Sequence, residues 1–176
     1  ASAILCDEQT VRRLGLASQA VRVRASVLGS GRARTEEEDN IGTRLTKRAY
    51  EISGTGPGDM HLAEVHDASA YGELVQTENL GFCPRGEGGV LARSGATRLG
   101  GKIPVNTSGG LESRGHPIGA SGLGQIHEIV TQLRGRAGKR QVEGARLGIA
   151  ENGGGALGVE EAAMGIHILE APSKAM

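Results

Sequence analysis

The chain has 176 residues, which is enough for one domain with a substantial core. Its 20 Lys and Arg residues balance 20 Asp and Glu residues, so charge does not indicate binding to nucleic acid or to an anionic membrane. Thirty glycines, with one Phe, two Tyr and no Trp, argue against base-stacking platforms and favour an aliphatic α/β protein with tight turns.

Hydrophobic runs, leader patterns and cysteine spacing indicate the cellular compartment. No apolar run approaches the length of a membrane span, and no signal-peptide pattern is visible. The two cysteines, Cys6 and Cys83, have neither metal-binding nor redox spacing. These observations predict a reducing compartment and a cytoplasmic location, without contact to a membrane or a nucleic acid.

Residues 1–6 are apolar and predict a short strand, followed by a helix from Asp7 or Glu8 to about Gly15. The chain does not begin with methionine, and a lone first strand needs a sheet to join. We interpret the chain as the C-terminal part of a longer protein. A processed fragment or a separately expressed subunit would give the same pattern.

The next elements follow from periodicity. Residues 21–28 alternate and are rich in β-branched side chains, which predicts a strand, and residues 29–40 are typical of a solvated loop. Residues 43–53 place apolar side chains at helical spacing, and the GTGPGD segment at 54–59 ends this helix.

A short strand over residues 61–66 ends in His66 and Asp67, and a helix follows as far as about Leu80. Ligands of α/β folds bind at the C-terminal ends of strands, so these two side chains are site candidates. The alternative is a surface histidine beside an ordinary helix cap, made by Asp67 or Ser69. The residues alone leave both interpretations open.

Residues 81–101 form a long turn-rich connection, a type that often binds ligands. Cys83 lies in it without an activating base nearby in sequence, so we interpret it as a bystander. Residues 103–106 predict a short strand leading into the most distinctive segment of the chain.

That segment, residues 106–125, reads NTSGGLESRGHPIGASGLGQ. Glycines surround His116, and Pro117 fixes the backbone directly after it. Apolar residues at helical spacing then predict a helix that begins between Gly119 and Ser121. A helix N-terminus favours developing negative charge, so His116 is a candidate acid, base or oxyanion donor. A structural histidine in a loop is the alternative.

The chain ends in a predicted antiparallel hairpin. A basic turn over residues 134–144 precedes a strand at 145–150, which leads into Glu151, Asn152 and three glycines. A last strand covers residues 162–169. The GGGALG sequence at 153–158 imitates a dinucleotide motif, but the chain ends too soon for the βαβ unit that such a motif requires. Thr131 breaks an H-E-x-x-H pattern, so we predict no metal site.

Three separated blocks resemble the thiolase family. GHPIGASG at 115–122 resembles the C-terminal active-site motif of thiolases, and its surroundings are most similar to the sterol-carrier-protein-type and archaeal acetyl-CoA acetyltransferase branch. EVHDASAYGELVQTENLGFCPRGEGG resembles that branch's "HDCF" region, where His66 and Asp67 replace the Asn-Glu of other thiolases. ENGGG at 151–155 stands at the C-x-G-G-G block.

The resemblance covers nearly the whole chain and implies a fold. A thiolase-type half has a mixed five-stranded sheet between helices, in the order βαβαβαββ. Residues 1–18 would then be the tail of the N-terminal half, and residues 19–176 the C-terminal domain. In the family two such halves pack together with the active site between them, and the full protein would be a homodimer or tetramer.

The resemblance also implies the chemistry of acyl transfer between coenzyme A and an enzyme thiol. The CoA thioester is a substrate, and no cofactor is bound covalently. The nucleophilic cysteine lies in the N-terminal half, so this chain alone would be inactive. His116, helped by His66, would stabilise thioester oxygens, and the backbone N–H groups of residues 153–155 (Gly153, Gly154 and Gly155) would form a second oxyanion hole. By position in the motifs, Asp67, Gly115 and Pro117 would contact substrate.

The sequence departs from the thiolase pattern at the positions that carry the catalytic thiol bases. Glu151 replaces the cysteine of C-x-G-G-G, and Ala68 replaces that of "HDCF". Our hypothesis is that Glu151, desolvated and with a raised pKa, removes the α-proton. Two alternatives stay open. One is a thiolase-fold aldolase acting on acyl-CoA side chains, with a small zinc-ribbon/OB-type partner. The other is a non-catalytic subunit that binds acyl-CoA or a partner.

Overall fold

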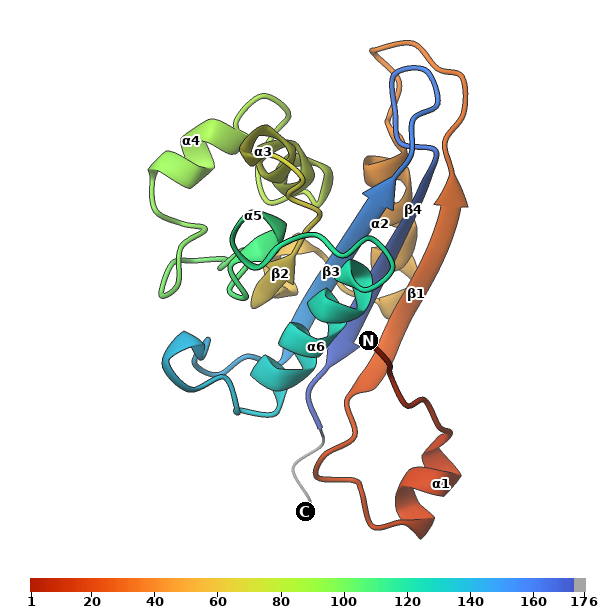
Figure 1. Cartoon of the computed structure of the whole chain (residues 1–176), viewed down its shortest axis with the longest axis vertical. Helices are drawn as coiled ribbons and strands as arrows, with labels where there is room; N and C mark the ends of the chain where they lie inside the picture. Colours follow the sequence, from red (N-terminus) through yellow and green to blue (C-terminus); the bar gives the residue numbers. More distant parts are fainter. Residues whose placement is uncertain (173–176) are drawn as a thin grey trace.

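The computed structural model describes residues 1–172 and contains a mixed four-stranded sheet (Figure 1). The strand order is β1-β4-β3-β2. The strands are β1 (Arg22–Ser30), β2 (Leu62–Glu64), β3 (Leu147–Gly154) and β4 (Ala163–Glu170). Strand β4 runs antiparallel to both of its neighbours, whereas β2 is parallel to β3. The α/β class, the mixed sheet and the closing hairpin are therefore confirmed.

The expectation of five strands is wrong by one. Val105 makes only an isolated parallel bridge with Ala63, at the edge where the fifth strand was expected. Two hydrogen bonds hold it there, from Ala63 N–H to the Pro104 carbonyl and from Asn106 N–H to the Ala63 carbonyl, each 2.9 Å long. The segment cannot extend, because Pro104 has no N–H to donate and Asn106 turns away at a φ of 51°.

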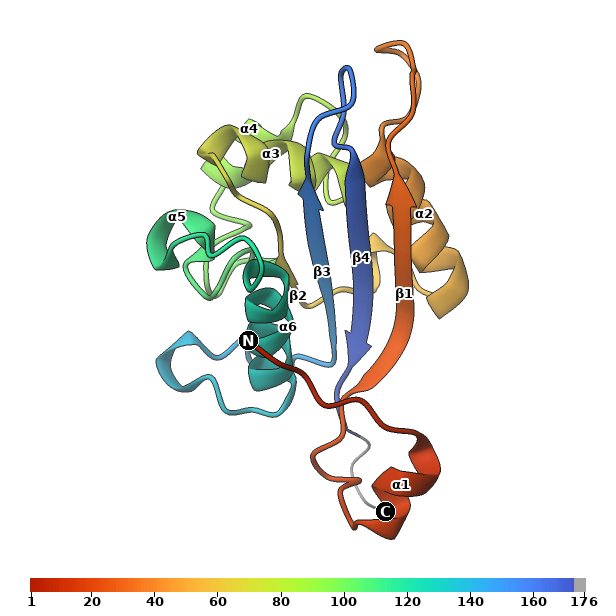
Figure 2. The same cartoon turned by 45° about the vertical axis from the view of Figure 1, so that its right-hand side comes forward.

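Two helices cover opposite faces of the sheet (Figures 1 and 2). Helix α2 (Ile41–Ser53) packs on the face that carries Ile149, and α6 (Ser121–Leu133) packs on the face that carries Ala150. Three shorter helices lie beyond β2, namely α3 (Ala70–Asn79), α4 (Gly88–Arg93) and α5 (Gly110–Arg114). Single-turn 3-10 helices occur at Pro57–Asp59 and Gly138–Arg140. Within residues 1–172, every helix is too short or too polar to cross a bilayer.

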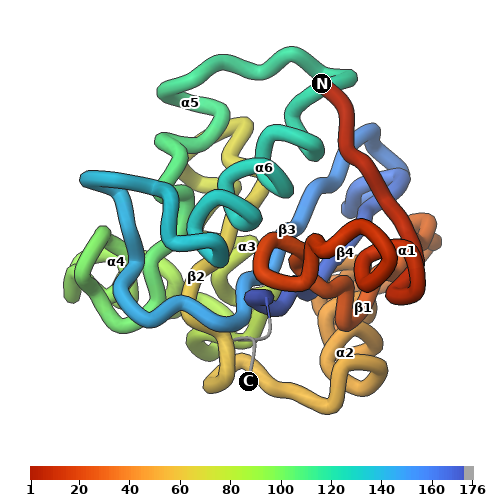
Figure 3. Tube along the Cα trace, turned by 90° about the horizontal axis from the view of Figure 1, so that it is seen from below, coloured from red at the N-terminus to blue at the C-terminus, as the bar shows by residue number. Residues whose placement is uncertain are grey.

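The predicted strand over residues 1–6 is wrong. This segment pairs with no strand, and the side chains of Ile4 and Leu5 are 97% and 82% exposed. An apolar run becomes a strand only where a sheet edge pairs with it, and both sheet edges lie elsewhere. The helix expected next does form as α1 (Glu8–Arg13), capped by Asp7. It buries none of its residues and lies beyond one end of the strands (Figure 3).

A buried carboxylate joins the β3–β4 turn to the loop before α2. The side chain of Glu160 is almost fully buried, and it accepts hydrogen bonds from Arg34 Nε at 2.8 Å and Arg44 Nη2 at 3.1 Å. The backbone N–H groups of Arg32 and Ile41 also donate to it, at 2.6 and 2.8 Å. Although burial acts to raise its pKa, the hydrogen bonds from Arg44 and these other donors lower the pKa to about 2.

Replacing Glu160 by glutamine is expected to lower the free energy of unfolding by about 1–3 kcal/mol, because the change leaves buried charged donors without their partner. A carboxyl whose pKa is lowered on folding stabilises the protein above pH about 4.5, and this stabilisation is lost as the pH falls toward 2. Denaturant unfolding should therefore show a smaller difference in stability between the wild type and Glu160→Gln at pH 3 than at pH 7. Glu38→Gln, at a half-exposed ion pair with Arg32, is the control and should change little.

Candidate active site

The two histidines of the sequence motifs meet in the structure. His66 follows β2, and His116 lies between α5 and α6. Their ring centroids are 5.0 Å apart, with an angle of 65° between the planes, which is an edge-to-face arrangement. The resemblance implied that His66 helps His116, and the structure brings these two residues together although they are 50 positions apart in the sequence.

The backbone that carries His66 is fixed by side chains from other segments. Val65 N–H donates to Asn106 Oδ1 and His66 N–H donates to Glu151 Oε2, each at 2.9 Å. Asn106 in turn donates through Nδ2 to Glu73 Oε2 on α3, at 2.8 Å. Since β2 ends at Glu64, these contacts replace the missing strand partners and set the direction of the His66 side chain.

His116 lies in an exposed turn and is held by Ser121. Gly115 ends α5 at a φ of +87°, a conformation that favours glycine, and Pro117 follows the histidine. His116 Nδ1 lies 2.7 Å from Ser121 Oγ, which also donates to the Pro117 carbonyl at 3.2 Å. One arrangement satisfies both contacts: the hydroxyl proton goes to Pro117, and Nδ1–H donates to the hydroxyl oxygen. Nε2 of His116 then keeps a lone pair for other chemistry.

The environment of His66 favours its neutral form. The ring is half-buried, and burial is the main cause that lowers the pKa of His66. The Gly153 backbone opposes this effect, and a charge on the neighbouring His116 would lower the pKa further. His66 therefore resists carrying a positive charge beside a charged His116.

Glu151 lies behind this pair on β3 and is fully buried. Burial raises the pKa of its carboxyl to about 8, an effect opposed by the His66 N–H and strengthened by Glu161 and Asp67. The raised pKa expected from desolvation is thus present. Oε2 accepts the His66 N–H, whereas Oε1 has no hydrogen-bond partner among the described residues. Burial therefore favours the protonated form of this carboxyl.

The three glycines differ in their geometry. Gly153 and Gly154 belong to β3, and only Gly155, at a φ of +72°, lies in the turn beyond the strand. The carbonyls of Leu147 and Glu151 accept hydrogen bonds from His61 N–H and Gln125 Nε2, on the side away from β4. By the two-residue alternation of a strand, the Gly153 N–H points to that same side, where His66 lies, and the Gly154 N–H points to β4.

Gly153 also lacks room for a side chain. A Cβ there would lie 2.9 Å from Met164 Cε and 3.3 Å from Glu151 Oε1. The backbone at Gly153 is thus packed tightly against the buried carboxyl of Glu151.

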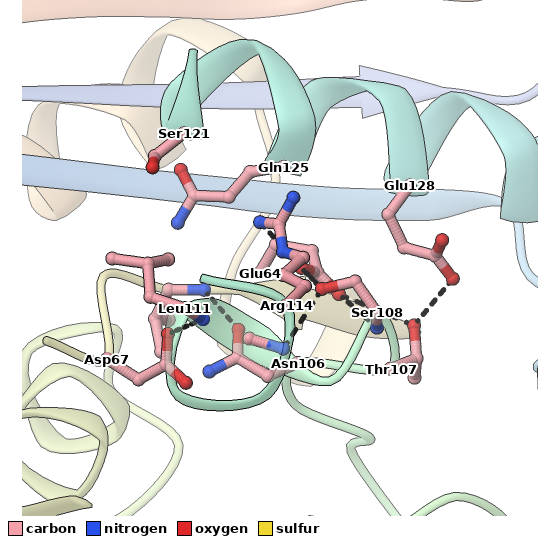
Figure 4. A network of polar contacts seen from close by, with 12 residues as sticks. Glu64, Asp67, Asn106, Thr107, Ser108, Leu111, Arg114, Ser121, Gln125 and Glu128 are labelled. Carbon is pink, nitrogen blue, oxygen red and sulfur yellow. Dashed lines mark hydrogen bonds and ion pairs between the residues drawn. The ribbon is translucent and has the colours of Figure 1, made fainter. Parts of the chain in front are cut away.

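The three residues expected to contact substrate have different environments. Asp67 is only 3% exposed, and its Oδ1 accepts the Leu111 N–H at 2.7 Å, while Gly110 leaves room for the carboxylate (Figure 4). Asp67 therefore holds the first turn of α5, the helix that leads to His116. Gly115 and Pro117 are exposed on either side of His116.

Sequence reasoning missed a set of buried polar residues beneath α6. Glu64, on β2, is fully buried and accepts hydrogen bonds from Ser108 N–H at 3.1 Å and from the Ser108 hydroxyl (Figure 4). Nearby, Gln125 Nε2 donates to the Glu151 carbonyl and Gln125 Oε1 accepts from Asn152, which fixes the end of β3. A signal was available: α6 carries buried polar residues at helical spacing on its sheet-facing side, namely Gln125, Glu128 and Gln132.

The two cysteines stay outside this constellation. Cys6 is exposed near the N-terminus. Burial and the charge of Glu78 raise the pKa of Cys83, so its thiol is not activated. Within residues 1–172, no group of three or more His, Cys, Asp or Glu side chains is arranged to hold a metal ion.

Comparisons with known proteins identify the family. A family model described as "Thiolase C-terminal domain-like" matches residues 40–169. The chain is 44% identical over 160 residues to sterol carrier protein 2 of Rattus norvegicus, covering 86% of this chain and 29% of that protein. It is 44% identical over 161 residues to an acetyl-CoA acetyltransferase of Methanothermobacter thermautotrophicus, and the match covers 88% of this chain and 41% of that protein.

The fold has a solved counterpart. A structure titled "Ltp2-ChsH2(DUF35) aldolase" matches with a TM-score of 0.71 and 25% identity, covering 88% of this chain and 40% of that one. The chain thus spans less than half the length of these relatives. The matched region contains the segments that position both histidines and Glu151. The chain belongs to the thiolase C-terminal domain-like family.

Proposed function

We propose that this chain is the C-terminal catalytic half of a thiolase-like acyl-CoA acyltransferase. The observation that carries the proposal is the edge-to-face pair of His66 and His116, 5.0 Å apart, with the buried Glu151 bonded to the backbone of His66. In this proposal residues 19–176 are the catalytic domain, and residues 1–18 are the tail of an N-terminal half that supplies the cysteine nucleophile. The weakly packed α1 supports that division.

In the first step, a cysteine thiolate attacks the carbonyl carbon of an acyl-CoA, and the CoA thiolate leaves. The carbonyl oxygen gains negative charge in the transition state, so donors placed in advance lower the barrier. His116, oriented by Ser121 and neighboured by His66, takes the proton of the cysteine thiol on Nε2 and then donates it in a hydrogen bond to this oxygen, and the Gly153 N–H supplies a second donor. Gly115 and Pro117 flank the bound thioester, and Asp67 maintains the turn that presents them.

In the second step, a base removes an α-proton from a second acyl-CoA, whose carbanion attacks the acyl-enzyme and releases the cysteine thiolate. Glu151 is the base, because both positions that carry thiol bases in similar thiolases lack cysteine here. A pKa of about 8 makes its carboxylate a stronger base than an ordinary glutamate. The unpartnered Oε1 is the oxygen free to accept the proton.

The test uses the full-length gene product. Incubation with acetyl-CoA should add one acetyl group to a cysteine outside this chain, seen by mass spectrometry, and the enzyme should thiolyse or form 3-oxoacyl-CoA. A folded protein that acquires no acetyl group overturns the proposal. We also propose that the full protein is a homodimer or tetramer, which light scattering on the same preparation can test. Its proposed cytoplasmic location can be tested by cell fractionation.

A second candidate is a thiolase-fold aldolase acting on acyl-CoA side chains. Two observations favour it: Glu151 and Ala68 replace the usual thiol bases, and the structural match is to an aldolase. A retro-aldol cleavage needs a base for a hydroxyl proton but no acyl-cysteine. Cleavage of a β-hydroxyacyl-CoA without enzyme acylation, and co-purification of a small zinc-ribbon/OB-type protein, would select this candidate. Binding of acyl-CoA without any turnover would indicate a non-catalytic subunit.

Replacing Ser121 by alanine should lower kcat for acyl transfer by about 10-fold, because it removes a hydrogen bond worth about 0.5–1.5 kcal/mol that orients His116. KM should change less, since the serine is buried beneath the histidine. Steady-state kinetics check this expectation. Ser94→Ala, at an exposed serine that follows the C-terminal end of α4, is the control and should behave as wild type.

A further inference from the structure

We propose that Arg114 and Glu64 form a positioning pair that holds His116 against His66. The basis is an ion pair between Arg114 Nη2 and Glu64 Oε2, 3.9 Å apart, which joins the two segments that carry the histidines (Figure 4). The consequence for catalysis rests on the proposed function, whereas the effect on the ring geometry does not.

Glu64 lies two residues before His66 and is fully buried. Ser108 donates its backbone N–H and its hydroxyl to this carboxyl, and Thr107 Oγ1 lies 3.4 Å from Oε1. Burial is the main cause that raises the pKa of Glu64 to about 7, and the nearby carboxylate of Glu128 on α6 adds to it, whereas the Ser108 hydrogen bonds and the charge of Arg114 lower this pKa. Arg114 is the cation that faces Glu64, and its charge favours the ionised form of this buried carboxyl.

Arg114 is the last residue of α5, and His116 follows after a single glycine. Its guanidinium lies over Gly124 of α6, where any Cβ would overlap Nη1. The side chain is 28% exposed, so it runs inward between α5 and α6 instead of extending into solvent. Gly124 therefore provides the passage through which Arg114 reaches Glu64.

The turn after Arg114 has little else to hold it. Residues 115–119 are all exposed, and the Ile118 side chain is 85% exposed. His116 is thus held from two sides, by Ser121 at the start of α6 and by Arg114 at the end of α5. If the Arg114 contact is lost, the turn can move away from His66, and a displacement of about 1 Å at a catalytic group can cost about 100-fold in rate.

The same network offers a matched control. Arg140 Nη2 pairs with Glu128 Oε2 at 2.8 Å, a shorter ion pair with a buried carboxylate beneath the same helix. Arg140, however, is followed by the loop to β3 and adjoins neither histidine. A purely structural contribution would make Arg140→Ala at least as damaging as Arg114→Ala, whereas positioning makes only the latter affect His116.

The experiment compares Arg114→Ala, Arg114→Lys, Glu64→Gln and Arg140→Ala in the full-length gene product labelled on histidine. The readouts are the nuclear Overhauser contact between the rings of residues 66 and 116, then kcat and KM for acyl transfer. We expect Arg114→Ala and Glu64→Gln to weaken or abolish the ring contact and to lower kcat about 10- to 100-fold with a smaller change in KM. Arg114→Lys should retain part of the ring contact and part of the wild-type kcat, and Arg140→Ala should retain the ring contact and kcat of the wild type.

An intact ring contact in folded Arg114→Ala overturns the inference. If that variant does not fold, an intact ring contact in Glu64→Gln, which keeps the size of the side chain and an oxygen that can accept the Ser108 N–H, overturns it equally. If the wild type shows no acyl transfer, the proposed function fails while the ring contact still decides the inference.

Discussion

Replacing His116 by alanine in the full-length protein is expected to lower kcat/KM for acyl transfer by about 10²- to 10³-fold. The structure fixes this imidazole in an exposed position, with Nδ1 bound to Ser121 at 2.7 Å, so that Nε2 can take up a proton in the reaction and then donate it to a developing oxyanion. The loss is expected in kcat more than in KM, because the charge develops in the transition state.

The measurement is steady-state thiolysis, combined with the rate of enzyme acylation in a single turnover. His127→Ala is the matched control, since His127 is an exposed histidine on α6 whose ring belongs to no contact of the site. His66→Ala should give a loss of similar size, and the double variant should be little worse than either single one, because the rings act together. Additive losses would mean that the two histidines act independently.

The second large effect is expected from Glu151→Gln, which should lower the exchange of acetyl-CoA α-protons by about 10²- to 10⁴-fold. Acylation of the enzyme should be preserved, because that step needs no α-proton transfer. In the wild type the exchange rate should rise with pH through about 8, since only the carboxylate form of Glu151 accepts a proton. Deuterium exchange followed by mass spectrometry measures the exchange rate in the variant and its pH dependence in the wild type. Unchanged exchange in the variant would show that Glu151 is not the base.

Glu143→Gln, at an exposed carboxyl near the opposite end of β3, is the control for this change. The stability of the fold gives an independent readout. Folding raises the pKa of Glu151 above its ordinary value, so its contribution to stability is complete below pH about 4.5 and is lost as the pH rises through about 8. Glu151→Gln should therefore flatten the decline of the urea midpoint between pH 5 and pH 8.5.

Much of this site could be predicted from the sequence, because its elements depend on local patterns. Alternation predicted β1, helical spacing predicted α2 and α6, and the strand–glycine–strand pattern predicted the final hairpin. The short α5 was missed, because its residues lie inside a glycine-rich motif whose pattern resembles a loop.

The remaining features depend on contacts between segments. The fifth strand is reduced to a single bridge at Val105 by the residues on either side of it, and residues 1–6 stay unpaired because both edges of the sheet lie elsewhere. The contacts from Glu64 to Arg114 and from Glu151 to the His66 backbone join residues 50 and 85 positions apart, which no periodicity reveals. A charged residue inside the apolar strand before His66 was the one visible sign of them.

The hydrogen bond from the His66 backbone to Glu151 limits which residues can replace Glu151. A cysteine at position 151 would be too short to accept that N–H at 2.9 Å, and an amide left without an acceptor in this half-buried position would oppose the change. Moving between a thiol and a carboxylate therefore requires the segment after β2 to adapt at the same time. We expect relatives with cysteine at this position to differ from this chain by a coupled set of substitutions, and a single Glu151→Cys replacement to weaken the structure around His66.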